Sequence, residues 1–511
     1  MKKSITILIT ALLMVSLLWG CGQQDPYTPT GNGLGEQGAT QPTLTPGGAE
    51  QKLSLVYHPD KTMNPYSCAD YTNRALFSLI YQGLFTVDKD YQVKAMLCSR
   101  FWVSEDQKTY IFYLENARFS DGIAVTAADV TASLEAARNG AVYRGRLTNV
   151  QSISVTEDGG VKIELSTPYE NLPLLLDIPI VKASQVDSDY PIGTGPYALE
   201  HGVSGRFLRL RLDWWCKAKL SVTAERISLV AVTSAKNIRD QFELGNAGVV
   251  CTNPASDSYV DFRSDHELWD CESGIFLYLG CRAKSSVFSN ENVRQALTHA
   301  IDRNALVHEY YRTFAQAATL PMSPNSPYYN EAVAENYGFH AQIFLDALQA
   351  EELTGKSIVL LVNQADGRRV KVAQAIAAML EECTLEVTVR ALSGEEYTKA
   401  LKNGNYDLHL GQTMLPPNMD LSAFFDTQGT LNYGGMSDAG IYALCQDALA
   451  NSGNYTALHQ AVMEDAMLCP VAFLSYAVYV QPDLVEDFAP ARDCIFYYDL
   501  GKRAENVRTE E

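Results

Sequence analysis

The sequence predicts an α/β protein with more than one lobe. Strand-like and helical segments alternate between residues 356 and 410, which is typical of a parallel sheet with crossover helices. A separate strand-rich stretch runs from residue 193 to about residue 271. The chain has 511 residues, and a body of that length exceeds what one hydrophobic core usually supports. Two or three packed lobes are therefore expected.

The alternating unit gives the clearest local prediction. It is expected to contain, in order, a strand at 357–362, a helix at 369–382, a strand at 385–392, a helix at 394–403 and a strand at 406–410. Gly404 is placed to end the second of these helices. Ligands of parallel sheets bind beyond the carboxyl ends of the strands. Segments 364–367 and 411–415 are thus the first candidates for a binding site.

The rest of the body follows from the same patterns. Short strands are expected at 53–57, 109–114, 161–165, 207–212 and 226–232. Helices are expected at 73–82, at 126–138, between Ser234 and Gly245, at 290–300 and at 303–311. Thr126, with Asp129 three residues later, and Asp302 are suited to cap the helices that follow them.

The first fifty residues indicate an export signal and a tether. Lys2 and Lys3 precede an apolar run from 5 to 19, which is shorter than the roughly twenty residues that span a bilayer. The run ends at Leu18-Trp19-Gly20-Cys21, which resembles the lipobox of bacterial lipoproteins, although Trp19 stands where a small residue is usual. We expect a signal peptide at 1–21, Cys21 as the lipid anchor and a flexible linker at 22–50. An ordinary secretory signal with a chance cysteine is the alternative.

The composition argues against several classes of function. A formal net charge of -20 opposes nucleic-acid binding, because phosphates demand a basic surface. Residues 350–357 match a relaxed phosphate-loop pattern, but a helix precedes them and a strand follows, which inverts the order that cradles a phosphate. The eight histidines show no zinc-site spacing, and the sequence has no Gly-x-Ser-x-Gly elbow. We expect no catalytic residue, no metal and no cofactor.

The cysteines are numerous for an exported chain. Besides Cys21, ten of the eleven cysteines remain, and most stand in apolar contexts without a CxxC motif. That context is typical of buried thiols, whereas export would permit disulfides. Mostly free thiols are the favoured prediction, and disulfide pairing is the alternative.

Short motifs occur along the chain in a fixed order. They are Met63-Asn64-Pro65, Ile80-Tyr81-Gln82-Gly83-Leu84-Phe85, Trp102-Val103-Ser104-Glu105-Asp106, Phe119-Ser120-Asp121-Gly122, Val125-Thr126-Ala127-Ala128-Asp129-Val130, Gly193-Thr194-Gly195-Pro196-Tyr197, Asp213-Trp214-Trp215, Val293-Arg294-Gln295-Ala296-Leu297, Ala300-Ile301-Asp302-Arg303 and Pro321. This series resembles the family 5 extracellular solute-binding proteins of ABC importers, which include oligopeptide, dipeptide and nickel binders. The motifs cover nearly the whole mature chain.

The resemblance implies a two-lobed periplasmic-binding-protein-like fold of type II, with an extra domain and a hinge between the lobes. Lobe I would comprise 51–63, 187–272 and 472–511, the extra domain 64–186, and lobe II 273–471. The chain would leave lobe I near 273 and return near 470. Most of the shared motifs are expected to be structural.

The resemblance also implies a function. A lipid-anchored body on the extracytoplasmic face of the membrane would close its lobes on a peptide or a similar-sized polar solute. It would then deliver that solute, as a monomer, to the permease and ATPase of an ABC importer. A sensing or scavenging lipoprotein of the same fold is the alternative, and a surface enzyme acting on peptides is a weaker one.

The candidate ligand contacts come from both lobes. They are Tyr57, His58 and Asn64 in lobe I, and Gln412, Thr413, Met414, Asp420, Asn432 and Tyr433 in lobe II. In peptide binders of the family, an acidic residue after the third strand of this unit pairs with the peptide ammonium group. Pro417 stands at that position here, and Asp420 follows three residues later. A free peptide N-terminus is therefore not assured as the recognised group.

Overall fold

The computed structural model describes residues 53–203, 205–216, 222–312, 314–485, 488–496 and 498. The predicted signal peptide, Cys21 and the whole of the predicted linker lie outside these residues. Within them, every helix is too short or too polar to cross a membrane.

An eleven-stranded mixed sheet forms the centre of the described chain. In spatial order its strands are β15 (Glu386–Leu392), β14 (Ser357–Asn363), β16 (Leu408–Met414), β12 (Glu267–Cys281), β17 (Leu468–Val480), β11 (Val249–Thr252), β1 (Ser54–Tyr57), β10 (Arg226–Ala231), β9 (Gly205–Leu210) and β8 (Tyr197–Gly202), with β13 (Ala315–Ala317) paired to β17. The sheet therefore joins segments from both ends of the chain.

The predicted parallel unit is confirmed. β14 pairs in parallel with both β15 and β16, and the helices α10 (Gly367–Glu382) and α11 (Gly394–Asn403) connect them. α10 begins two residues earlier than predicted, because the Asp366 carboxylate caps it by accepting from Arg369 N at 3.0 Å. Gly404, with a φ of 63°, ends α11 as expected.

The third strand of that unit differs from the prediction. β16 starts at Leu408 and continues to Met414, because Gly411–Met414 pair in antiparallel register with Ile275–Tyr278 of β12. The segment expected beyond the strand end therefore lies mostly inside the sheet. Gly411 is required there, since the Tyr278 ring packs directly over it.

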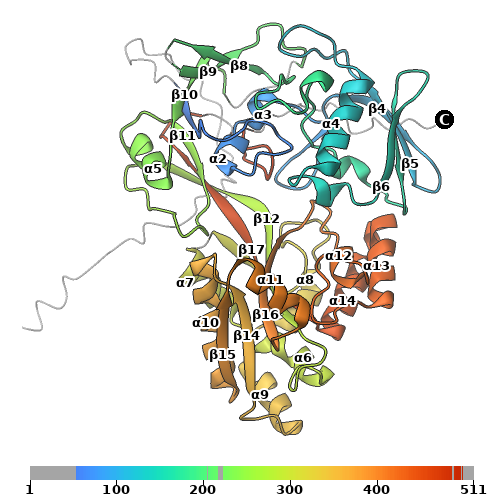
Figure 1. The fold of residues 1–511 in the computed structure, drawn as a ribbon, viewed down its shortest axis with the longest axis vertical. Helices are drawn as coiled ribbons and strands as arrows, with labels where there is room; N and C mark the ends of the chain where they lie inside the picture. Colours follow the sequence, from blue (N-terminus) through green and yellow to red (C-terminus); the bar gives the residue numbers. More distant parts are fainter. Residues whose placement is uncertain are drawn as a thin grey trace, which may run out of the picture. The chain divides into compact units, whose positions relative to one another are not determined.

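Two long antiparallel strands, β12 and β17, run side by side through the middle of the sheet (Figure 1). Every residue of β17 is buried. The register between the strands shifts between Glu272 and Ile275, so Ser273 and Gly274 form a bulge. Gly274 adopts a φ of 71°, a conformation that glycine reaches without strain. The bulge contains residue 273, near which the chain was expected to leave lobe I.

A second, four-stranded antiparallel sheet stands apart in the sequence, between β1 and β8. Its order is β4 (Cys98–Val103), β5 (Thr109–Leu114), β7 (Val161–Leu165) and β6 (Val150–Val155), and a hairpin of β2 (Phe85–Val87) and β3 (Val93–Ala95) precedes it. Helix α4 (Ala127–Asn139) begins at the predicted capping box, in which Thr126 and Asp129 bond reciprocally.

The predicted helix at 73–82 is wrong. Two single-turn helices, α2 (Tyr71–Arg74) and α3 (Phe77–Ile80), take its place. All residues from Ala75 to Ile80 are buried, so no solvent-facing side remains for one amphipathic helix. The carbonyl of Ile80 instead accepts from Gly195 N at 2.8 Å, and Tyr81 turns into extended backbone.

The remaining helices follow the sequence patterns closely. They are α5 (Ala235–Glu243), α6 (Glu291–Leu297), α7 (Arg303–Tyr311), α8 (Glu331–Ala334), α9 (Ala341–Ala350), α12 (Ser422–Phe425), α13 (Ala439–Ala450) and α14 (Tyr455–Asp465). Ser234 and Asp302 cap α5 and α7 as expected. The helix predicted at 290–300 ends as α6 at Leu297 and finishes in a 3-10 turn, Thr298–Ala300. β9 and β10 end one or two residues earlier than predicted.

No disulfide bond joins any two of the ten cysteines that the structure describes, and nine of them are buried. Burial raises the pKa of the Cys98 thiol to about 12 and that of Cys68 to about 11. These thiols pack as small apolar side chains.

Candidate functional site

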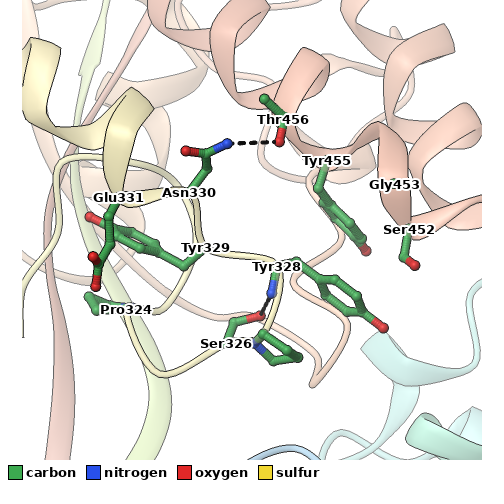
Figure 2. A pocket seen from close by; sticks show the side chains of 11 residues that line it. Pro324, Ser326, Tyr328, Tyr329, Asn330, Glu331, Ser452, Gly453, Tyr455 and Thr456 are labelled. Carbon is green, nitrogen blue, oxygen red and sulfur yellow. Dashed lines mark hydrogen bonds between the residues drawn. The ribbon is translucent and has the colours of Figure 1, made fainter.

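A cavity of about 630 Å³ lies between the loop before α8 and the start of α14 (Figure 2). Aromatic and small polar side chains line it: Pro324, Ser326, Pro327, Tyr328, Tyr329, Asn330, Glu331, Ser452, Gly453, Tyr455 and Thr456. Its volume lies within the range of small-molecule sites. Aromatic rings with adjacent hydroxyl, amide and carboxylate groups suit a solute that has both apolar and polar parts.

Contacts between the two walls fix the shape of this cavity. The rings of Tyr328 and Tyr455 stack with centroids 5.0 Å apart. Asn330 Nδ2 donates to Thr456 Oγ1 at 3.2 Å (Figure 2). Tyr455 also donates through its hydroxyl to the Asn418 carbonyl at 2.7 Å. The loop and the helix are therefore held together before any solute is considered.

At the α14 end of the cavity, a segment between β7 and β8 makes contact. Glu170 accepts from Ser452 N at 2.8 Å through its carboxylate. Its own backbone N donates to the Leu449 carbonyl at 3.1 Å. Glu170 belongs to the stretch expected to form the extra domain, so this contact joins that stretch to the wall of the cavity.

At the Pro324 end, Glu272 makes an equivalent junction. Its carboxylate accepts from Ser323 Oγ at 2.8 Å and from Asn325 Nδ2 at 3.2 Å. The hydroxyl of Tyr91, from the loop between β2 and β3, donates to the same carboxylate. Burial and the charge of Glu272 together raise the pKa of Tyr91 strongly. Glu272 thus ties three distant segments together at the β12 bulge.

A buried ionic cluster joins the stretch expected to form the extra domain to the C-terminal segment. Arg146 pairs with both Asp177 and Asp493, and Arg74 pairs with Asp493 at 3.0 Å. Burial raises the pKa of Asp177, whereas the pKa of Asp493 is lowered, because three arginines offset the effect of its burial. Asp493 is therefore the firmly ionised member of the cluster.

Arg492 extends from this cluster to the bulge. Its Nη2 donates to the Leu415 carbonyl just after β16. The backbone N of Leu415 in turn donates to the Gly274 carbonyl at 3.0 Å. The guanidinium lies against Gly274, where any Cβ would overlap it. The C-terminal segment thus reaches the strand that carries the predicted ligand contacts.

The three predicted residues of lobe I take different roles. Tyr57 is buried at the end of β1. His58 Nδ1 hydrogen-bonds to Asp70 Oδ2 at 2.9 Å, and its buried Nε2 has no hydrogen-bond partner among the described residues. Asn64 donates to the carbonyls of Val186 and Ser188 at 2.7 and 2.8 Å, so its amide holds backbone in place. Of these three side chains, only that of His58 has a buried polar atom without a partner among the described residues.

The predicted ligand contacts on β16 and in the segment after it also differ in their structural roles. Gln412, Thr413 and Met414 lie on β16 opposite Leu277, Phe276 and Ile275, and the side chain of Met414 is exposed. The carboxylate of Asp420 accepts from Ser422 N at 2.8 Å and from Ser422 Oγ at 2.6 Å. Burial raises the pKa of Asp420. These local bonds make it a turn residue and weaken its case as an ammonium partner.

Asn432 and Tyr433 lie in a loop beside an aromatic cluster. Asn432 bonds within its own loop, to the Asp426 carbonyl and to Ser437 N. The Tyr433 ring lies edge-on to His409, with centroids 6.2 Å apart. His409 is buried between Tyr278 and Tyr406.

The cavity between the loop before α8 and the start of α14 is called the tyrosine cavity below, after Tyr328, Tyr329 and Tyr455. None of the nine predicted contacts lines it. Tyr328, Tyr455, Glu170 and Glu272 carry no motif in the sequence, and only Pro321, three residues before Pro324, stands close to a recognisable one. Among the residues that the structure describes, no group of three or more His, Cys, Asp or Glu side chains could hold a metal ion.

The class of protein follows from this fold and from a family match. A model described as Bacterial extracellular solute-binding proteins, family 5 Middle, matches residues 92–434, which is more than half of the chain. The chain belongs to this family, whose members bind solutes outside the cytoplasm.

Individual proteins of known identity are also similar to this chain. The glutathione-binding protein GsiB of Salmonella typhi is 28% identical over 283 residues, covering 52% of this chain and 55% of that protein. The chain thus spans about half the length of the curated relatives it matches. The structure of HbpA2 from Haemophilus parasuis has a TM-score of 0.73 at 20% identity and covers 87% of this chain and 98% of that one. NikZ from Campylobacter jejuni, solved with Ni(L-His), has a TM-score of 0.63 at 18% identity, with 89% and 97% covered. At these identities the two structures establish the fold.

Proposed function

We propose that this chain is the lipid-anchored, extracytoplasmic binding component of an ABC importer. In this proposal it captures a peptide or a similar-sized polar solute between lobe I with its extra domain and lobe II, and delivers that solute to a permease. The partition expected from the sequence, with a hinge near 273 and 470, is part of the proposal. The adjacent strands β12 and β17 and the bulge at Gly274 support it.

The observation that carries the proposal is the tyrosine cavity and its two junctions. Its walls come from the stretch assigned to lobe II, and Glu170 and Glu272 connect both of its ends to the stretch assigned to the extra domain. A solute that fills the cavity and extends to Glu170 or Tyr91 would add contacts between these parts. A solute shifts the equilibrium between the open and the closed lobes towards the closed state only through contacts that it makes in the closed state alone.

The test uses residues 51–511, produced without the signal and without Cys21. Native mass spectrometry and thermal unfolding are measured with pools of di- to pentapeptides, reduced glutathione, nickel chelates and oligosaccharides. We expect one class, with peptides first, to raise the melting temperature, because a ligand that binds only the folded state stabilises it. If no class raises it, the binding function is wrong.

Matched variants locate the site. Tyr328→Ala removes an aromatic wall and is expected to weaken binding of the active pool about tenfold or more, as loss of a buried aromatic contact does. Tyr113→Ala, on the surface of the four-stranded sheet, is the control and should leave binding unchanged. Equal affinities for the two variants would place the solute elsewhere.

The lipid anchor has its own test. In the full-length chain, Cys21→Ser should move the protein from the membrane fraction to the soluble fraction, because no acyl chain would then hold it. Retention of the variant in the membrane fraction would contradict anchoring through Cys21.

A further inference from the structure

The tyrosine cavity has one charged residue in its lining. That residue is Glu331, the first residue of α8, and it is exposed. The Asn330 side chain caps α8 by accepting from Val333 N at 3.2 Å, so the cap of the helix does not require Glu331. Within the described part of the chain, the Glu331 carboxylate pairs with no hydrogen-bond donor and no cation. Glu331 therefore offers an unused acceptor to a solute in the cavity.

Three further carboxylates stand around the cavity without a cation. Glu170 accepts from one backbone N–H at the α14 end, and Glu272 accepts from three neutral side chains at the Pro324 end. Asp420, close enough to Tyr455 for its charge to act on that phenol, accepts from the serine two residues later. Neutral donors leave the negative charge of a carboxylate in place. These charges therefore add to that of Glu331.

Elsewhere the chain pairs its buried carboxylates with arginine, as in the contacts of Arg146 with Asp177 and Asp493. Among the described residues, no Arg, Lys or His lines the tyrosine cavity. Arg303 lies near Tyr329, but it is buried and donates to backbone carbonyls that are not part of the lining. The cavity thus carries negative charge that its own walls do not neutralise. Such a site attracts cations and disfavours anions.

The charged and the aromatic parts of the lining face each other. Figure 2 shows Glu331 on one side of the cavity and Tyr328 with Tyr455 on the other. The two rings stack with centroids 5.0 Å apart, and the Tyr455 hydroxyl is held by the Asn418 carbonyl at 2.7 Å. Burial raises the pKa of Tyr455 well above its ordinary value, so this wall stays uncharged. A solute that spans the cavity meets aromatic rings at one end and a carboxylate at the other.

We propose that Glu331 receives a positively charged group of the solute, an ammonium or a guanidinium, while the rest of the solute packs against Tyr328 and Tyr455. The inference rests on the proposed function and deepens it by naming the class of solute, which is cationic. Either group forms a charge-assisted hydrogen bond with a carboxylate. Because Glu331 is exposed, this contact is weaker than a buried ion pair, and added salt screens it.

One experiment varies the charge of the solute at nearly constant size. Four pools of tri- and tetrapeptides contain either arginine or its uncharged analogue citrulline, each with a free or an acetylated N-terminus, and are titrated into the 51–511 protein. At least one of the two cationic groups should raise the affinity about fivefold or more over the acetylated citrulline pool. The comparison of the pools shows whether the ammonium or the guanidinium is the recognised group.

Two variants separate the charge from the aromatic wall. In Glu331→Gln the preference should fall below about twofold, and the exposed position means that the fold should be unaffected. In Tyr328→Ala all four pools should bind more weakly while the preference for cationic pools remains. The control is Glu396→Gln on α11, which removes an equally exposed negative charge outside the cavity and should keep the full preference. Raising sodium chloride from about 0.05 M to about 0.5 M should reduce the preference of the wild type.

A second readout needs no peptide. Butylammonium chloride, compared with sodium chloride at the same concentration, should change the melting temperature of the wild type by about 1 °C or more in the stabilising direction relative to Glu331→Gln. The difference between the two proteins isolates binding at Glu331, because any general effect of the amine on stability is common to both.

The outcomes separate this inference from the proposed function. If all four pools bind equally well, or if Glu331→Gln keeps the full preference, Glu331 does not recognise a positive charge, although the binding function stands. If Glu396→Gln loses the preference to the same degree, the effect belongs to the net charge of the protein and the inference fails. If no pool binds but the butylammonium effect depends on Glu331, the proposed function fails for peptides and the cation site stands.

Discussion

His409 and His459 are buried histidines whose ring nitrogens all lack hydrogen-bond partners within the described residues. Burial lowers the pKa of each to about 4, from an ordinary value of about 6.5. Between these values the unfolded chain binds a proton that the folded chain does not. The contribution that these two neutral histidines make to the stability of the fold is thus fully present above about pH 6.5 and is lost as the pH falls towards 4.

His459→Met should reduce this acid sensitivity. Each such histidine can change the free energy of unfolding by up to about 1.4 kcal/mol per pH unit in that window. Met fills the same apolar site without a titrating group. Guanidinium unfolding of the 51–511 protein from pH 7.5 to pH 4.5 measures the slope, which should be shallower for the variant. Identical slopes would show that His459 does not contribute.

Single residues were predictable where their partners are close in sequence. Thr126 with Asp129, Ser234 and Asp302 cap their helices as expected, because each bond spans three residues. Asn64 was not predictable, since its amide bonds to Val186 and Ser188, more than a hundred residues away. Arg492 is likewise defined by Gly274 and Leu415, which only the folded chain brings to it.

At the scale of elements, α4 provides a direct test of local stabilisation. Thr126→Ala removes the two bonds between the Thr126 hydroxyl and Asp129, leaves the bond from the backbone N of residue 126 to the Asp129 carboxylate, and should lower the free energy of unfolding by about 1 kcal/mol. Thr131→Ala in the same helix is the control, because the buried hydroxyl of Thr131 has no partner among the described residues. Urea unfolding should place Thr126→Ala clearly below Thr131→Ala, and the reverse order would contradict the role of the cap.

The elements that the sequence misplaced share a cause. The helix expected at 73–82 is divided because Gly193 and Gly195 pack against the backbone at Ile80. β16 extends past Leu410 because β12, more than a hundred residues earlier, pairs with it. In both cases a long-range contact overrides the local pattern, whereas α10, α11 and β14, whose partners are neighbours in sequence, form where they were expected.

At the scale of the whole molecule, contacts between the stretches assigned to lobe I and lobe II can be tested together. The Asp257 carboxylate, in the loop after β11, accepts from Gly367 N at 2.6 Å and from Arg368 N at 2.9 Å at the start of α10. An anion at a helix N-terminus is stabilised by the free N–H groups and by the helix dipole. This contact exists only while the two stretches are together.

Asp257→Asn should therefore weaken the binding of every solute by a similar factor of about two to five, which corresponds to the loss of a charge at a helix end. Asp240→Asn, on α5, is the control for charge and should leave affinity unchanged. Titration calorimetry with a free-acid and an amidated peptide measures both variants. A loss confined to one of the two peptides would show that Asp257 contacts the solute instead of favouring closure.

The place of β17 in the sheet has a consequence for biosynthesis. β17 follows all the other described strands in the sequence, yet within the described residues it is the only strand that links the half of the sheet containing β1 and β11 to the half containing β12 and β16. A chain truncated before Leu468 would leave two unjoined half-sheets, each with an open edge. Completion of the sheet must therefore wait until the chain has been synthesised as far as β17.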